Sequence, residues 1–394
     1  MSVNSDKDSD FSKLEHIKSK ALRAIGEILP VESPNNYSGW GDRTNAGRDL
    51  PPQYLVYFLL IKLLRFPYVG RDEKVAWTVP IKFQERVFVI EHRKMGLGVF
   101  TQDPIENNEL AIKIVKHIHR AVKAARPYFD WLASQAVQNS SVSVISNSPQ
   151  LFARYEFLLD SYRAKREEMV RRKDEVIVTK VNTPYGELDE FDYPRFRLKK
   201  ESHWLALSAV EAFFSWTEHV FVHLAILTGK ISTGHEVTQL AQESWVVKCN
   251  TVLDLSNKRD KVNYDKLLPI RRALRNFIAH GAFGKDGSAF LFHSSAGAVP
   301  VVLPHQLGSR KFRVVSATYF DDEAAFDIIN DFIANMWSGD RSPARLYIED
   351  GGRDLILPMA KDGTYAEAMR SDHDMAEFVE ALEYQSDIAA NMDW

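Results

Sequence analysis

Four segments between residues 203 and 337 carry apolar residues at helical spacing, and this pattern constrains the fold most. An amphipathic helix must bury its apolar stripe against another element, so the four segments are expected to pack together. The expected helices span about 203–228, 236–256, 269–280 and 322–337. Four amphipathic helices of this kind predict a four-helix bundle.

Residues with known end preferences support these helix boundaries. We expect Ser202 to cap the first helix and Gly229 to close it. Pro269 suits the first turn of the third helix, and Gly281 lies just past its end. Asp321 or Asp322 is the expected cap of the fourth helix, whose apolar face carries Phe326, Ile329, Phe332, Ile333 and Met336.

A glycine-punctuated stretch, 281–318, separates the third expected helix from the fourth. It contains "SAFLF", "VPVVL" and "KFRVVSA", whose β-branched and aromatic residues predict strands. The bundle is therefore expected to carry a β insertion before its last helix.

The rest of the chain predicts smaller mixed elements. We expect helices at about 8–29, 53–65, 105–137 and 148–174, the last with Ser148 as N-cap, and two or three strands within 74–100. The acidic, turn-rich stretch 181–194 is interpreted as a linker. After residue 340 we expect a hairpin turning at Gly351-Gly352 and a final amphipathic helix.

These elements predict a mainly α fold with small β elements in three parts. Residues 1–195 form an N-terminal α+β region of unknown role, residues 196–340 the bundle, and residues 341–394 an acidic C-terminal hairpin and helix.

Composition narrows the function classes. The 394 residues have a net charge of -3, so any nucleic-acid site must be a local patch rather than a global attraction. The single cysteine, Cys249, allows no internal disulfide, which fits a reducing compartment. The polar N-terminus does not resemble a secretory signal, and the apolar run 54–64 is too short to span a bilayer. We expect a cytoplasmic protein with no membrane partner.

The end of the third expected helix, "RRALRNFIAHG", carries the chemistry. Asn276 and His280 are four apart and share a helix face, and Arg275 adjoins Asn276. The helix dipole favours a protonated imidazole in the last turn. A guanidinium, an amide and a titratable imidazole at one helix end can hold a phosphate, orient a hydroxyl and move a proton.

This motif, in this setting, resembles that of the HEPN domain, a four-helix bundle of prokaryotic toxins, antiviral effectors and some eukaryotic RNases. The family signature is Arg, four to six residues, then His, with a polar residue after the Arg. Arg275, Asn276 and His280 match it, and "WLALSAVEAFFSWTEHVFVHLAILTG" and "ESWVVKCNTVLDL" resemble the first two family helices. The resemblance covers residues 200–340, roughly a third of the chain.

The resemblance implies a metal-independent endoribonuclease that needs no cofactor. The ribose 2'-hydroxyl would attack the adjacent phosphorus, with His280 as general acid or base, Arg275 stabilising the transition state and Asn276 orienting the phosphate or the imidazole. Glu211 and Glu218 are candidates for a supporting acid on an earlier helix. The resemblance also implies a homodimer with a shared cleft. It further implies a role in toxin–antitoxin systems or antiphage defence, with an antitoxin or trigger protein as a further partner.

Local charge is consistent with an RNA partner. Residues 256–285 hold eight basic and two acidic side chains. The candidates for contacts with the RNA backbone are Lys258, Arg259, Lys261, Arg271 and Arg272. A solvated helix face would have the same composition. Residues 341–394 hold twelve acidic and five basic side chains, so the tail either covers a basic cleft or only aids solubility.

Other interpretations stay open. The bundle could keep the HEPN fold without cleavage and act as an RNA-binding or protein-interaction module. His219 and His223, four apart, could share a metal, although no third ligand is evident. Glu91, Arg93 and Lys94 weakly suggest a metal-dependent nuclease strand. His117 and His119 diverge on a helix and are interpreted as surface residues.

Overall fold

The computed structural model describes the backbone of residues 3–37, 39–184, 186–280, 288–295, 297–302, 313–314 and 321–391. The chain divides into two units, Met1–Gln138 with Glu383–Trp394, and Asn139–Leu382. Each unit has its own hydrophobic core. The fold is mainly helical with small sheets, as the sequence predicted. Within the described ranges no helix is both long and apolar enough to cross a membrane.

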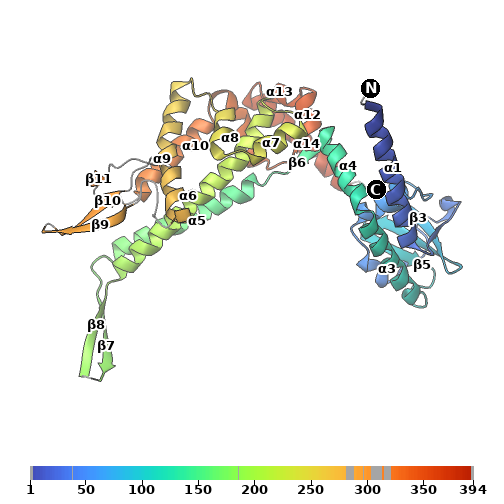
Figure 1. Cartoon of the computed structure of the whole chain (residues 1–394), viewed down its shortest axis with the longest axis horizontal. Helices are drawn as coiled ribbons and strands as arrows, with labels where there is room; N and C mark the ends of the chain where they lie inside the picture. The colour runs from blue at the N-terminus through green and yellow to red at the C-terminus, as the bar shows by residue number, and fades with distance from the viewer. Residues whose placement is uncertain are drawn as a thin grey trace. The chain divides into compact units, whose positions relative to one another are not determined.

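The first unit is built on a five-stranded antiparallel sheet of order β1-β3-β4-β5-β2. Its strands are β1 (Leu29–Pro30), β2 (Asp42–Arg43), β3 (Val75–Phe83), β4 (Arg86–Arg93) and β5 (Gly96–Thr101). β3, β4 and β5 are the three strands expected within 74–100. Their buried side chains share a core with helices α1 (Val3–Ile25) and α3 (Asn108–Ala124), which Figure 1 draws beside the sheet.

Helix boundaries in this unit differ from those expected. α1 ends at Ile25 rather than near 29, because Gly26 adopts a φ of +64° and turns the chain. A Cβ at Gly26 would lie 2.8 Å from His117 Cε1, so the site also lacks room for a larger residue. The helix expected over 105–137 is two helices, α3 and α4 (Arg126–Gln138). The break falls just before Pro127, which cannot continue a helix from the preceding turn.

The buried helix expected over 53–65 has two parts. α2 (Gln53–Tyr57) runs directly into η3 (Phe58–Leu63), a π-helix. Leu59, Leu60 and Ile61 are buried in the core of the first unit. Short elements fill the preceding stretch, η1 (Pro34–Asn36) and η2 (Ala46–Asp49).

Two long helices, α5 (Ser148–Arg171) and α6 (Pro194–Leu227), pack side by side in the second unit (Figure 1). Tyr155, Leu159 and Tyr162 of α5 lie in the same core as the apolar residues of α6. Trp216 Nε1 of α6 donates to Ser148 Oγ at 3.0 Å. Ser148 is the first residue of α5, and Asn147 is its N-cap, one position earlier than expected.

The expected domain boundary near 195 is wrong. The stretch interpreted as a linker forms an exposed antiparallel hairpin, β7 (Ile177–Thr183) and β8 (Gly186–Asp192), which joins α5 to α6. The hairpin extends beyond the ends of the two helices (Figure 1). Because α5 packs on α6, the two units separate near residue 138 instead.

The expected cap of α6 is also wrong. The helix begins at Pro194, with Tyr193 as the capping residue. Ser202 lies inside the helix, where its Oγ donates to the carbonyl of Lys199 at 3.0 Å. A serine that satisfies its hydroxyl within the preceding turn is compatible with a helix interior.

The second expected helix is broken into α7 (Gly234–Gln242) and α8 (Trp245–Val252). Thr233 and Glu236 form a capping box at the start of α7, and the Ser244 side chain caps α8.

The third helix, α9 (Lys258–His280), begins well before Pro269, which lies in its interior. The fourth, α10 (Asp322–Met336), is confirmed, because Asp321 caps it by accepting from the Ala324 N–H at 3.1 Å.

The β insertion is confirmed in its described residues. β9 (Ser288–Ser294), β10 (Gly297–Val302) and β11 (Arg313–Val314) form an antiparallel sheet of order β11-β10-β9. Residues 281–287, 303–312 and 315–320, including Gly281, lie outside the described part of the chain.

The C-terminal part is neither a hairpin nor a separate tail. Leu346–Asp350 form a π-helix, η5, and β12 (Leu355–Ile356) pairs with β6 (Ser143–Val144) far away in sequence. Three helices follow, α12 (Leu357–Lys361), α13 (Thr364–Ala368) and α14 (Asp372–Asn391). The amphipathic α14 was expected, and Met375 is buried in the core of the second unit.

Candidate functional site

The motif residues Arg275, Asn276 and His280 all lie on α9, whose backbone is helical from Lys258 to His280. Their side chains lie outside the described residues. The regular backbone places positions 276 and 280 one turn apart on one face. Position 275 follows Arg271 by one turn in the same way.

The inward face of α9 anchors this helix to the bundle. Leu267, Ile270 and Leu274 are buried in the same core as Phe332 of α10 and the apolar residues of α6. Tyr264 stacks on Trp245 of α8, with ring centroids 6.4 Å apart. The half of α9 that precedes the motif therefore packs against α6, α8 and α10.

A cluster of charges joins α6, α8 and α9 one turn before the motif. Glu218 Oε1 accepts from Arg271 Nη2 at 3.2 Å, and Glu218 Oε2 from Lys248 Nζ at 3.5 Å. The Lys248 side chain is only 7% exposed, so the nearby carboxylate offsets the cost of burying its ammonium group. We call these three residues the Glu218 cluster.

Two aromatic rings complete the setting of Arg271. Its guanidinium carbon lies 5.3 Å from the Phe214 ring centroid and 5.1 Å from that of Trp245, within cation–π range. Trp245 is itself held, since its Nε1 donates to Thr217 Oγ1 at 2.9 Å. The Glu218 cluster therefore holds α6, α8 and α9 together within the bundle.

Sequence reasoning assigned Glu218 and Arg271 to separate roles, and the structure brings them together. Glu218 was a candidate supporting acid and Arg271 a candidate phosphate contact. Arg271 is half-buried and paired with Glu218, so it does not present a free guanidinium to solvent. Glu211, seven residues earlier on α6, is exposed and lies outside the Glu218 cluster.

The remaining basic candidates are exposed but do not form one patch with Arg271. Lys258, Arg259 and Lys261 lie in the first turn of α9, and Lys261 pairs with Asp265 at 3.1 Å. Arg272 is exposed near the other end of the described side chains. Along a helix, residues 258 and 272 are roughly 20 Å apart, so these residues form two groups.

The two histidines of α6 are a structural pair. His219 Nε2 accepts from the backbone N–H of Asn147 at 2.9 Å, and His223 Nδ1 donates to the carbonyl of His219 at 3.1 Å. Burial lowers the pKa of His219 to about 4 and also lowers the pKa of His223. The lone pair of His219 that a metal would need is already engaged. Among the described residues no group of three or more metal-ligating side chains occurs.

The nuclease strand suggested by Glu91, Arg93 and Lys94 is not supported. Glu91 is fully buried and accepts from the Gly39 N–H at 2.9 Å, from Thr78 Oγ1 at 2.6 Å and from Arg93 Nε. A carboxylate with three donors inside the protein fixes the sheet and is not available to a metal.

The histidines of α3 differ from one another. His119 is exposed, as expected, and its Nε2 lies 2.7 Å from the carbonyl oxygen of Asp49. His117 is half-buried against Phe83, with ring centroids 5.9 Å apart, so its interpretation as a surface residue is wrong.

A basic pocket of about 480 Å³ in the first unit was not expected from the sequence. Its lining includes Arg120, Lys123 and Arg126 from the end of α3 and the start of α4. The sequence shows basic residues at every third position here. The break between α3 and α4, whose ends line the pocket, was not expected.

Protein-family models, curated proteins and solved structures contain no significant match to this chain. A functional assignment therefore rests on the chain's own residues and their arrangement.

Proposed function

We propose that the protein is a metal-independent endoribonuclease of the HEPN type, with Arg275, Asn276 and His280 as its catalytic residues. The observation that carries the proposal is the continuity of α9 through His280. An unbroken helix holds the Arg-Asn-x3-His spacing that the chemistry needs, at the end of an element anchored in the bundle core.

The chemistry is an internal transfer at phosphorus. The 2'-oxygen of one ribose forms a bond to the adjacent phosphorus while the bond to the 5'-oxygen breaks, which leaves a 2',3'-cyclic phosphate and a 5'-hydroxyl. His280 moves the proton between these oxygens. Arg275 stabilises the added charge on the phosphoryl oxygens, and Asn276 orients the phosphate or the imidazole.

We assign the Glu218 cluster a positioning role. Glu218 contacts two cationic side chains, one of them buried, so its carboxylate is already bonded within the bundle. It fixes α9 against α6 and α8 one turn before Arg275. Glu211 stays the candidate for a supporting acid, because its carboxylate is exposed.

RNA is the proposed partner, and the exposed residues Lys258, Arg259, Lys261 and Arg272 are the proposed backbone contacts. A homodimer that brings two α9 helices together would complete the site. Light scattering of the full chain at micromolar protein is expected to give twice the chain mass. An antitoxin or trigger protein, within a toxin–antitoxin or antiphage system, would control the activity.

The nature of the product ends tests the mechanism. An RNA oligonucleotide incubated with the protein should yield fragments ending in a 2',3'-cyclic phosphate, and the same oligonucleotide with one deoxyribose at the cut position should resist there. Fragments ending in a 3'-hydroxyl would contradict the proposal, because they form when water attacks the phosphorus and the bond to the 3'-oxygen breaks.

The alternative function is a non-catalytic HEPN-like bundle that binds RNA or a protein. One observation favours it: Arg271, a candidate phosphate contact, is paired with Glu218 inside the bundle, so this part of α9 has a structural role. Saturable RNA binding without any cleavage, unchanged in His280→Ala, would support this alternative.

A further inference from the structure

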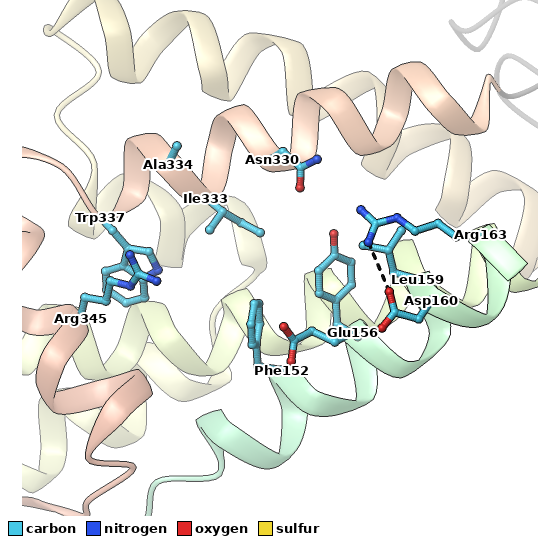
Figure 2. Close-up of a pocket in the computed structure, with 11 residues that line it drawn as sticks. Phe152, Glu156, Leu159, Asp160, Arg163, Asn330, Ile333, Ala334, Trp337 and Arg345 are labelled. Atoms are coloured by element: carbon cyan, nitrogen blue, oxygen red, sulfur yellow. Dashed lines mark hydrogen bonds and ion pairs between the residues drawn. The ribbon is translucent and has the colours of Figure 1, made fainter.

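A pocket of about 570 Å³ lies between α5 and α10, within the second unit. Figure 2 shows side chains of both helices facing the space between them, with Arg345 at one end and Arg163 at the other. Arg345 belongs to the short helix α11 (Ser342–Arg345). Neither the motif of α9 nor the Glu218 cluster takes part in this pocket.

Both arginines of the pocket are already neutralised. Arg163 Nη1 donates to Asp160 Oδ1 at 3.2 Å, the contact drawn in Figure 2. Arg345 Nε donates to Glu349 Oε2 at 2.7 Å, and the same carboxylate accepts from Trp337 Nε1 at 2.8 Å. An anionic ligand would have to compete with these carboxylates.

Glu156 is the charged group left over. Among the residues that the structure describes, its carboxylate has no hydrogen-bond or ion-pair partner. It is exposed and lies on α5 beside the apolar stripe formed by Phe152, Tyr155 and Leu159. The two acidic and two basic side chains of the lining sum to zero, and Glu349, which pairs with Arg345 from outside the lining, makes the total one negative charge.

A buried hydroxyl also lacks a partner. Tyr155 lines the pocket and is 2% exposed, and its hydroxyl makes no hydrogen bond within the described part of the chain. Burial raises the pKa of Tyr155 to about 12, so the group stays neutral and can donate or accept. A buried polar group without a partner destabilises the protein unless a ligand or water satisfies it.

Much of the remaining lining is apolar, and it includes two aromatic rings. Phe152 and Trp337 line the pocket beside Tyr155, and the Phe152 and Tyr155 ring centroids are 5.8 Å apart. Aromatic faces attract cations and also cover the hydrocarbon part of a ligand.

We propose that this pocket binds a small organic cation, an amine or a guanidine. Its charged group donates to the Glu156 carboxylate and to the Tyr155 hydroxyl oxygen, and its hydrocarbon part packs on Phe152 and Trp337. Asn330 of α10 lines the same pocket and offers an amide to a second polar group of the ligand. The proposal does not depend on ribonuclease activity.

Isothermal titration calorimetry of the full chain with agmatine and with spermidine tests the proposal. We expect saturable binding of at least one of them with one site per chain. Glu156→Gln should weaken that binding about tenfold or more, because a charge-assisted contact becomes a neutral one. Glu167→Gln is the matched control, since Glu167 is exposed on the same helix outside the pocket and its loss should leave the affinity unchanged.

Tyr155→Phe supplies a second variant that keeps the ring and should weaken binding about threefold to tenfold. Circular dichroism checks that each variant is folded. The proposal is overturned if neither amine binds saturably, or if Glu156→Gln and Glu167→Gln weaken binding equally, which would indicate only general attraction to acidic groups. Tighter binding of an anionic probe such as adenosine monophosphate would also overturn it.

Discussion

At the scale of single residues, the contacts of Glu218 with two cationic side chains define its role. We predict that Glu218→Gln lowers the free energy of unfolding by about 1 to 2 kcal/mol, because Lys248 loses its carboxylate inside the protein. Urea unfolding measures this change. Glu211→Gln is the control and should change the stability by less than about 0.5 kcal/mol, since Glu211 is exposed. Equal effects of the two substitutions would mean that the Glu218 cluster does not stabilise the bundle.

His219 makes stability depend on pH. Its pKa is about 4 in the folded chain, below the ordinary value of 6.5, mainly because of burial. The unfolded chain therefore binds a proton that the folded chain does not between these values, so this contribution to stability is complete above pH 6.5 and is lost as pH falls toward 4. Protonation would also break the bond from Asn147.

The expected result is a fall in the melting temperature between pH 6.5 and 4 that is smaller in His219→Asn. His235→Asn is the control, because His235 is exposed and should keep the wild-type profile. Identical pH profiles for all three proteins would show that His219 does not carry the effect.

The sequence predicted the relative positions of residues well where the helical repeat alone determines them. It predicted them poorly where they depend on how distant elements pack. The placement of Asn276 and His280 one turn apart needed only the period of a helix. The pairing of Glu218 with Arg271 depends on how α6 and α9 pack, and nothing in the local sequence encodes that contact. Glu156 was missed for the same reason, since its pocket needs both α5 and α10.

At the scale of elements, Asp260 ties the start of α9 to the end of α10. Its carboxylate accepts from Arg341 Nη1 at 3.0 Å and Nη2 at 2.9 Å, and from Asn335 Nδ2 at 2.7 Å. Asp260→Ala should cost about 3 to 5 kcal/mol of unfolding free energy, because it leaves the largely buried Arg341 unpaired. Asp265→Ala, an exposed change in the same helix, should cost little, and a similar loss in both variants would refute the assignment.

The β7–β8 hairpin is expected to contribute little to stability. Every residue of β8 is exposed, and of β7 only Thr183 is half-buried. Replacing residues 177–192 by a short Gly-Ser linker should change the free energy of unfolding by about 0.5 kcal/mol or less. A large loss in chemical denaturation would mean that the hairpin packs against part of the protein or against a partner copy.

Element types were predicted better than element ends. The apolar periodicity and the Asp321 cap located α10 correctly. Pro269 was expected at the start of α9, but the helix accommodates it in its interior and begins at Lys258. The tail was misread because Gly351-Gly352 suits a hairpin turn, yet β12 finds its partner in β6, far away in sequence. Tertiary pairing here overrides a local turn signal.

At the scale of the whole molecule, two separate cores imply two folding units. The stretch 181–194 has the composition of a linker and also that of an exposed hairpin, so composition alone placed the boundary too late. A fragment of residues 139–391, which keeps all of α14, should fold without residues 1–138. Helical circular dichroism with one cooperative unfolding transition would agree, whereas a fragment without cooperative unfolding would not.

The central claim is that α9 carries a ribonuclease site, and cleavage of a labelled RNA in the presence of EDTA tests it most directly. Wild-type protein should cleave, and His280→Ala should lose on the order of 100-fold or more in rate while keeping its circular dichroism spectrum. His235→Ala, an exposed histidine on α7, should cleave like wild type. Cleavage by His280→Ala at the wild-type rate, or complete loss of wild-type cleavage on chelation, would contradict the account.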